Sequence, residues 1–195
     1  MASEVEICNL ALSHIGKYHI NSLADAQKES IECRLLYPRA RDSVLRDHPW
    51  NFARKQLTLG ELTETYVNWD YAYQYPVDCL LALEIYNPSG SDDQIPFEIG
   101  ISADLNSRVI LTNHEQAVLI YTAAVTNPNI FDSVFIDAMA YRMAADLALP
   151  LRGDPQVQQA MLNLYAGLLG RAQTVNANEQ FQDPVDDCSF ITARA

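Results

Sequence analysis

Apolar residues recur at helical spacing near the start of the chain, directly after a sequence that favours a first helical turn. The Ser3 hydroxyl can accept a bond from a free backbone amide while the Glu6 carboxylate reaches back to the Ser3 amide. Gly16 favours the end of a helix. The pattern therefore predicts a short amphipathic helix whose apolar face carries Val5, Cys8, Leu12 and Ile15.

A second helical pattern follows a polar connector. Ser22 and Asp25 offer a weaker start signal. Pro38 lacks a backbone donor and crowds the preceding turn, which predicts a kink or a restart within the helix. The helix is expected to end at His48, because a residue before proline is disfavoured in the α region. We expect Ile31, Leu35 and Leu45 to share its apolar face, and Trp50 and Phe52 to plug the end of the bundle.

The periodicity changes between residues 57 and 127. Alternating or apolar runs are separated there by turn signals, the clearest at 87–93. Four or five short strands are predicted, arranged as one antiparallel meander. A nucleic-acid stacking surface on the tyrosines of this segment is disfavoured, because no Lys or Arg is interleaved with them.

Helical periodicity returns in the last third of the chain. Segment 131–149 is apolar nearly all round, as is typical of a central buried helix. The spacing of Arg142 and Asp146 predicts an ion pair. Asp154 as N-cap and Pro155 at the first helical position then begin a fourth helix. Its predicted apolar stripe is formed by Val157, Met161, Leu164 and Leu168.

The last twenty residues, 176–195, are polar and acidic and show no helical stripe. In a free monomer we expect a disordered tail. Its spaced apolar residues suggest a strap that orders on a partner, through Phe181, Val185, Phe190 and Ile191.

Together these elements predict a mainly α, α+β fold: a four-helix bundle with an inserted antiparallel β-meander subdomain and an extended C-terminal tail. The predicted bundle domain comprises residues 1–56 and 128–175, the β-rich subdomain 57–127, and the strap 176–195. A length of 195 residues suits one domain with an inserted subdomain.

Charge is distributed unevenly along this plan. The formal net charge is −12, yet residues 1–56 carry 8 Lys and Arg against 7 Asp and Glu, while residues 57–195 carry 5 against 18. Such an acidic protein is not expected to grip DNA through its phosphates. Repulsion between the acidic protein and the DNA phosphates is consistent with a protein past which DNA moves without binding.

The basic residues concentrate in the second helical pattern, where they alternate with acids. Solvent exposure is the simplest interpretation of this charged face, and Asp42 and Arg46 have the spacing of an ion pair. The alternative is a contact between subunits, because Arg is enriched at interfaces. The candidate contact residues are Arg34, Arg39, Arg41, Asp42 and Arg46.

Motifs that carry enzyme chemistry are not recognisable in the sequence. The seven glycines form no phosphate-binding cluster, and His14 and His19 are spaced for different helix faces, unlike a metal-binding pair. We predict no catalytic activity, cofactor or metal. No apolar run approaches the roughly 20 residues of a membrane span. Scattered cysteines without a CxxC pair suggest buried or idle reduced thiols in a cytosolic setting, at Cys8, Cys33, Cys79 and Cys188.

Several stretches, taken in order, resemble the tail tubular protein A family of tailed bacteriophages. These are the run E-x-CNLALSHIG from Glu6 to Gly16, then INSLADAQKES, then CRLLYPRARDSVLRDHPWNFA. The resemblance continues through Tyr75-Pro76-x-Asp78-Cys79-Leu80 and from Ala123 to Pro150. It covers roughly residues 4–172 and leaves the tail from residue 176 without a match.

The resemblance implies a structural head-to-tail adaptor. Family members form a dodecameric ring of helical bundles, each with a β-rich subdomain inserted between the second and third long helices. The ring joins the portal protein to the tail nozzle, tubular protein B, at the head-tail junction of the virion, after assembly in the host cytoplasm. Double-stranded DNA is retained by and ejected through its lumen without sequence-specific binding. The C-terminal segment typically reaches towards the portal.

Three other interpretations stay open at this point. One is a neck or tail-completion ring of a long-tailed phage. Another is an acidic mimic of DNA, which would bind a basic partner with strong salt dependence. The third is an enzyme with an unrecognised helical active site, which would need a deep polar pocket and a strongly shifted titrating group.

Overall fold

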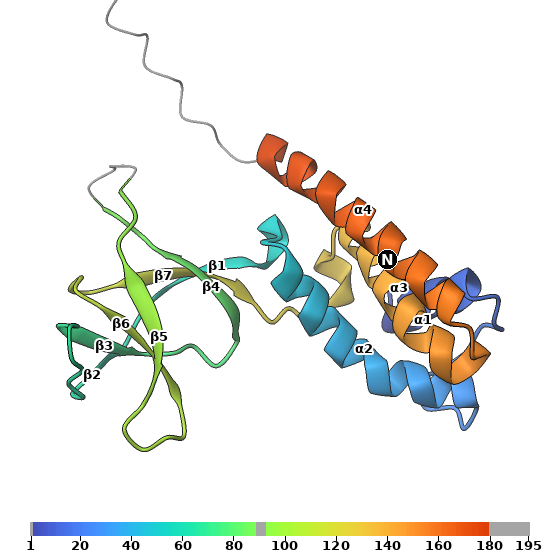
Figure 1. The fold of residues 1–195 in the computed structure, drawn as a ribbon, viewed down its shortest axis with the longest axis horizontal. Coiled ribbons are helices and arrows are strands. Elements are labelled where there is room, and N and C mark those ends of the chain that lie inside the picture. Colours follow the sequence, from blue (N-terminus) through green and yellow to red (C-terminus); the bar gives the residue numbers. More distant parts are fainter. Residues whose placement is uncertain (1, 89–92, 180–195) are drawn as a thin grey trace, which may run out of the picture.

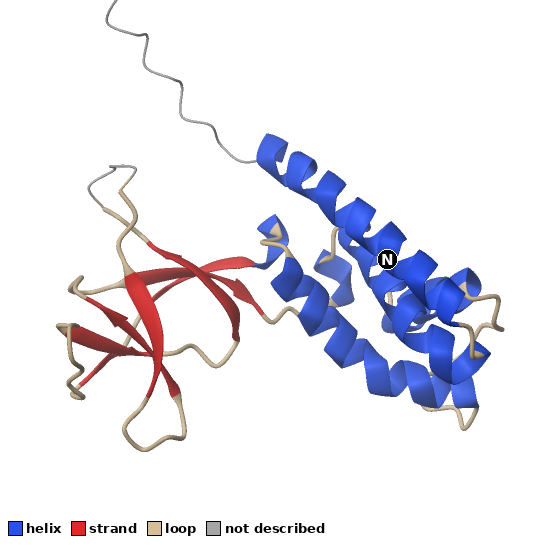
Figure 2. Ribbon diagram, viewed as in Figure 1, coloured by secondary structure: helices blue, strands red, loops and turns tan. Residues whose placement is uncertain are grey.

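Four helices pack together, and two small antiparallel sheets are inserted between the second and the third (Figures 1 and 2). The computed structural model describes residues 2–88 and 93–179. The helices are α1 (Glu4–His14), α2 (Lys28–Asp47), α3 (Ser133–Leu147) and α4 (Pro155–Glu179). The α+β class and the position of the inserted strands are therefore confirmed, whereas the division into separate domains stays a prediction.

Helix α1 begins and ends as its sequence predicts. The Glu6 amide donates to the Ser3 hydroxyl at 3.1 Å, and the Ser3 amide donates to the Glu6 carboxylate at 2.8 Å. Gly16 has a φ of 69°, the left-handed conformation that glycine adopts easily. The buried side of the helix contains Cys8 and Leu12, with Ile15 directly behind it.

Helix α2 starts later than the capping signal suggested and continues through its proline. The Ser22 amide donates to the Asp25 carboxylate in a turn, while the helix begins at Lys28. Pro38 lies inside the twenty-residue helix and does not divide it, so of the two predicted effects, a kink or a restart, the restart is wrong. An exposed proline costs one hydrogen bond in the ladder, which the packing of the opposite side of a long helix can offset.

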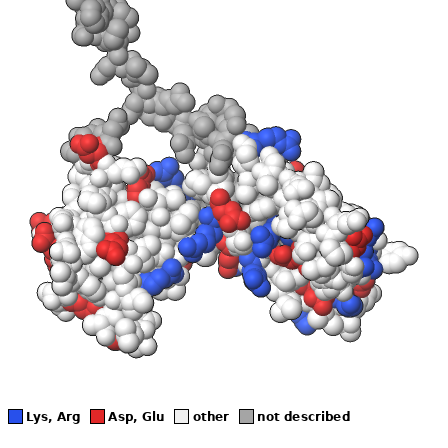
Figure 3. Space-filling model, in the orientation of Figure 1, with Lys and Arg blue, Asp and Glu red and all other residues white. Residues whose placement is uncertain are grey.

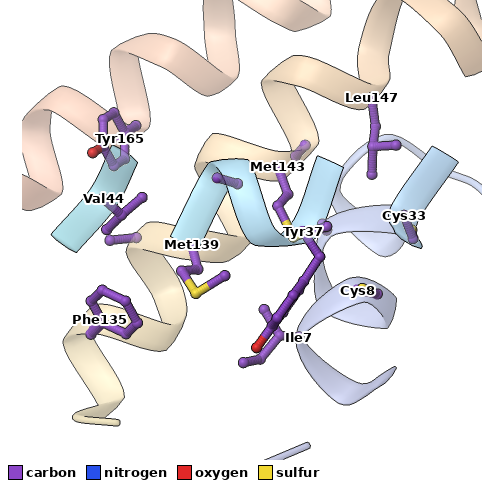
Figure 4. Packing of buried hydrophobic residues seen from close by; sticks show 14 of the residues in the cluster. Ile7, Cys8, Cys33, Tyr37, Val44, Phe135, Met139, Met143, Leu147 and Tyr165 are labelled. Atoms are coloured by element: carbon purple, nitrogen blue, oxygen red, sulfur yellow. The ribbon is translucent and has the colours of Figure 1, made fainter. Parts of the chain in front are cut away.

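Helix α3 occupies the centre of the helical part, as predicted, and packs against α1, α2 and α4. Figure 4 shows side chains from the other three helices converging on it, among them Ile7, Tyr37 and Tyr165. The predicted ion pair is present, with Arg142 Nε 3.3 Å from Asp146 Oδ2. The fully buried residues of α3 include Phe135, Met139, Met143 and Leu147.

A π-helical turn, Ala148–Arg152, connects α3 to α4. Gly153 ends it with a φ of 70°, and the Asp154 carboxylate accepts the Gln156 amide at 3.0 Å, which confirms the predicted start of α4. The predicted stripe is correct for Leu168, which is buried, but wrong for Leu164, which is 49% exposed. Tyr165, Leu168 and Ala172 form the buried side instead. The helix also continues through residues 176–179, the beginning of the predicted strap.

The inserted strands form two sheets rather than one meander. One sheet has the order β1-β7-β4 and the other β2-β3-β6-β5, so most neighbours are distant in sequence. Alternation along a strand predicts which face is buried but not which strand lies beside it, which explains the error. The strands are β1 (Arg54–Thr58), β2 (Glu61–Leu62), β3 (Tyr71–Gln74), β4 (Cys79–Ile85), β5 (Phe97–Ile101), β6 (Arg108–Thr112) and β7 (Val118–Ala123).

Trp50 closes the helical core where the chain leaves α2, as predicted. Its side chain is buried and its indole N–H donates to the Val44 carbonyl at 2.9 Å. Phe52 is only partly buried, but its ring lies 5.1 Å from that of Phe135, which the Trp50 ring contacts at the same distance. The two aromatic side chains therefore seal the junction between helices and sheets.

Across residues 2–88 and 93–179, no helix has both the length and the apolar character that crossing a membrane requires.

Candidate interaction surfaces

The five residues predicted to form a subunit contact all lie on α2, but they do not share one face. Arg39, Asp42 and Arg46 follow at spacings of three and four residues, which places them on one side of the helix. Arg41 is largely covered, with its side chain 13% exposed. Arg34 lies seven residues before Arg41, about two helical turns, and shares its side of the helix. The structure thus brings together three of the five candidates.

Two apolar residues that we expected in the core are exposed on the outer side of α2. Leu35 is 70% exposed and Ile31 is 43% exposed, whereas Leu45 is buried as predicted. The buried side is formed by smaller or less apolar residues, namely Cys33, Tyr37, Ala40 and Val44. Helical spacing identified the helix, but the most apolar residues misled the assignment of its buried face.

The exposed stripe along the helix is called the α2 face here and consists of Ile31, Leu35, Arg39, Asp42 and Arg46. Its acid is engaged: Asp42 pairs with Arg41 at 2.8 Å, and not with Arg46 as predicted. Arg46 instead donates from Nη1 to the Leu80 carbonyl at 3.2 Å. Because a carbonyl does not neutralise a guanidinium, the stripe combines two apolar side chains with a net positive charge.

A second group of cations lies where β1 leaves the helices, and Figure 3 shows Lys and Arg gathered between the two parts of the molecule. Arg54 pairs with Glu84 at 2.6 Å, and Lys55 pairs with Asp78 at 2.7 Å. The Tyr121 hydroxyl also donates to Asp78 at 2.9 Å. The Lys55 ammonium holds the pKa of Asp78 below its usual value, and Asp78 in turn raises the pKa of Lys55. Partnered in this way, these cations brace β1 against β4.

The end of β5 and the turn between β5 and β6 carry apolar side chains that the sequence analysis did not single out. Leu105 is 80% exposed and Ile101 is 60% exposed. Leu105 also has a φ of 61°, a left-handed conformation that costs a non-glycine residue of order 1–3 kcal/mol. A leucine inside an otherwise polar turn, ADLNS, is the signal that could have identified this site.

This turn is fastened to the loop that follows β2. The Glu64 carboxylate accepts the Ala103 amide at 3.0 Å, and the Leu105 amide donates to the Ser102 carbonyl at 2.9 Å. Bonds from Ser102 and Asn106 keep the pKa of Asp104 below its usual value, so this carboxyl stays charged. The resulting surface is called the sheet tip and consists of Glu64, Ile101, Asp104 and Leu105.

A hollow of about 470 Å³ lies beside α1 and contains a serine close to a histidine. Ser13 Oγ is 2.7 Å from His19 Nε2 and donates to the Asn9 carbonyl at 2.9 Å. A hydroxyl has one hydrogen, so with the Asn9 bond formed His19 donates to Ser13 rather than accepting its proton. This arrangement favours a structural contact over a nucleophile and its base.

The remaining candidate residues divide between the core and the part of the chain outside the described residues. Cys8, Cys33 and Cys79 are free and buried. No group of three or more His, Cys, Asp or Glu suited to a metal ion occurs among residues 2–88 and 93–179. Portal docking therefore stays a prediction, because its residues lie outside the described ones: Phe181, Val185, Phe190 and Ile191.

The comparisons with known proteins add no relative to these observations. A scan against models of protein families gives no match, and a search of curated proteins gives none either.

Proposed function

We propose that this protein is a structural head-to-tail adaptor of a tailed bacteriophage, which forms a ring between the portal and the tail. One observation carries the proposal: the β-rich segment is inserted between α2 and α3. The family that the sequence resembles is expected to carry its β-rich subdomain at this same place. Most of the stretches that carry the resemblance lie in the helical part, and one, Tyr75-Pro76-x-Asp78-Cys79-Leu80, leads into β4. The position of the sheets agrees with the plan that this resemblance implies.

Exposed side chains support assembly rather than a function of the isolated chain. The α2 face presents two apolar side chains and two arginines to solvent. Arginine combined with apolar surface is typical of protein interfaces. We therefore assign the contact between subunits of the ring to Arg39, Asp42 and Arg46, and no longer to the covered Arg41.

The net charge of −12 supports a passage for DNA that does not hold it. A ring whose inner surface repels phosphate lets the duplex slide during ejection. In this proposal residues 180–195 form the strap that reaches the portal, and the four helices form the body of the ring.

Native mass spectrometry of the protein, alone and mixed with the portal of its own phage, tests this function. We expect a monomer or small oligomer that becomes a dodecamer on the portal, because weak single contacts need a template to offset the entropy of association. A protein that ignores the portal and instead binds a basic host protein in low salt would refute the adaptor and support the DNA mimic.

A further inference from the structure

The α2 face and the sheet tip are complementary in composition. Both present exposed aliphatic side chains, Ile31 and Leu35 on the first and Ile101 and Leu105 on the second. The α2 face adds arginines, whereas the sheet tip adds carboxylates. Residues 57–127 as a whole contain ten Asp and Glu and only one basic residue, Arg108. The net charges of the two surfaces are therefore opposite.

The two surfaces do not cover one another within a single copy. Helix α2 contacts β4 and β7, which belong to the sheet nearer the helices. The sheet tip belongs to the other sheet, which lies farther from the helices in Figure 1. The apolar side chains of both surfaces consequently remain exposed unless a second molecule covers them.

Hydrogen bonds also hold the turn of the sheet tip in a fixed conformation, with its apolar side chains exposed. Its turn is anchored by the Glu64 carboxylate, which accepts the Ala103 amide at 3.0 Å and the Tyr66 hydroxyl at 2.6 Å. The backbone at Leu105 is left-handed, which costs a non-glycine residue of order 1–3 kcal/mol, and the leucine side chain is 80% exposed. Burying this side chain against a partner would offset that cost.

We propose that the sheet tip of one copy docks on the α2 face of a second copy, with Leu105 against Leu35 and the tip carboxylates towards Arg39. This contact joins two different surfaces, so it is heterologous and repeats from copy to copy, closing into a ring where the rotation allows. The inference rests on the proposed function, because it uses the same α2 face and names the surface that covers it.

Charge complementarity favours a second copy over other occupants of the α2 face. A partner must supply apolar side chains and negative charge together, and the sheet tip supplies both from hydrogen-bonded positions. Asp42 does not oppose this approach, because its carboxylate is already held by Arg41 at 2.8 Å.

The contact is tested with two variants, each of which disables one of the two surfaces. Leu35→Asp removes the α2 face and leaves the sheet tip, whereas Leu105→Asp does the reverse. Sedimentation velocity of the wild type should show self-association with a Kd of about 1 mM or tighter. Each variant alone should associate roughly tenfold more weakly or not at all.

Mixing the two variants gives the decisive measurement. Each retains the surface that the other lost, so the mixture should form a one-to-one dimer that grows no further. Association should weaken at higher salt, since the contact pairs opposite charges. Leu164→Asp is the matched control, because Leu164 is exposed on α4 and belongs to neither surface. Circular dichroism and a urea midpoint verify that each variant folds.

Three outcomes would overturn the contact. The first is a wild type that stays monomeric at protein concentrations up to about 1 mM. The second is a Leu105→Asp protein that associates as strongly as the wild type, as a contact between two α2 faces would allow. The third is a mixture that gives no dimer. Capture of the wild type by the portal is measured separately. Normal association without portal capture therefore refutes the adaptor function and leaves this contact standing.

Discussion

Trp50 shows how one side chain combines packing with a required hydrogen bond. Its indole is buried among aromatic rings, and its N–H satisfies the Val44 carbonyl near the end of α2. We expect Trp50→Ala to lower the free energy of unfolding by about 3–5 kcal/mol. Trp50→Phe keeps much of the packing but removes the donor, so it should cost only about 1–3 kcal/mol. Urea denaturation measures both costs. Equal costs would mean that the aromatic packing retained by phenylalanine contributes nothing, whereas a cost near zero for Trp50→Phe would mean that the hydrogen bond contributes nothing.

His48 predicts a pH dependence of stability. Burial lowers the pKa of this imidazole from its ordinary value of 6.5, because the charged form loses solvation. Protonation therefore favours the unfolded chain, so the stability contribution is complete above pH 6.5 and is lost as the pH falls below it.

The measurement is the urea midpoint between about pH 7.5 and about pH 5.5 for wild type and His48→Gln. The variant cannot take up this proton, so its stability should fall less over that interval. Parallel curves for the two proteins would show that His48 does not contribute.

At the scale of elements, two glycines predict opposite effects of the same substitution. Gly153 ends the turn before α4 with a φ of 70° and has no atom within 4 Å of a built Cβ, so Gly153→Ala meets only backbone strain. We expect a loss of about 1–2 kcal/mol in the free energy of unfolding. Gly167 lies inside α4, also with open space around it. Gly167→Ala should therefore stabilise the protein by about 0.5–1 kcal/mol.

Thermal or urea unfolding of the two alanine variants tests this pair directly. The sign of the difference matters more than its size, since the chemical change is identical. Destabilisation by both substitutions would indicate that α4 does not continue as a regular helix through Gly167.

Helix α2 shows how far element prediction can go. Its existence, its end before Pro49 and the burial of Leu45 follow from local sequence. Its buried face does not, because Ile31 and Leu35 are more apolar than the Cys33 and Tyr37 side chains that pack in their place. Only the position of α1 and α3 decides which side of the helix is covered.

At the scale of the whole molecule, removing the C-terminal segment should separate folding from assembly. Helix α4 continues to Glu179, so the truncated chain should end there and not after the buried Ala172. In a chain that ends at Glu179 we expect an unchanged urea midpoint and a loss of portal binding. A truncated protein that still decorates portals would disprove the assignment of the strap.

The sequence by itself determined the helices, the caps of α1 and α4, and the place of the inserted strands. These follow from interactions within a few residues, such as the bonds between Ser3 and Glu6 or the restart at Asp154. The pairing of Arg142 with Asp146 belongs to the same class, because helical geometry alone brings the two side chains together.

Only the tertiary structure decided the two sheets, the outward face of α2 and the sheet tip. Strand order depends on contacts between residues far apart in sequence, and β1 pairs with β7 across more than half of the inserted segment. The sheet tip likewise exists because Glu64 reaches Ala103 from another loop. Local patterns record which residues prefer burial, but the free energy of the whole packing decides which of them remain exposed.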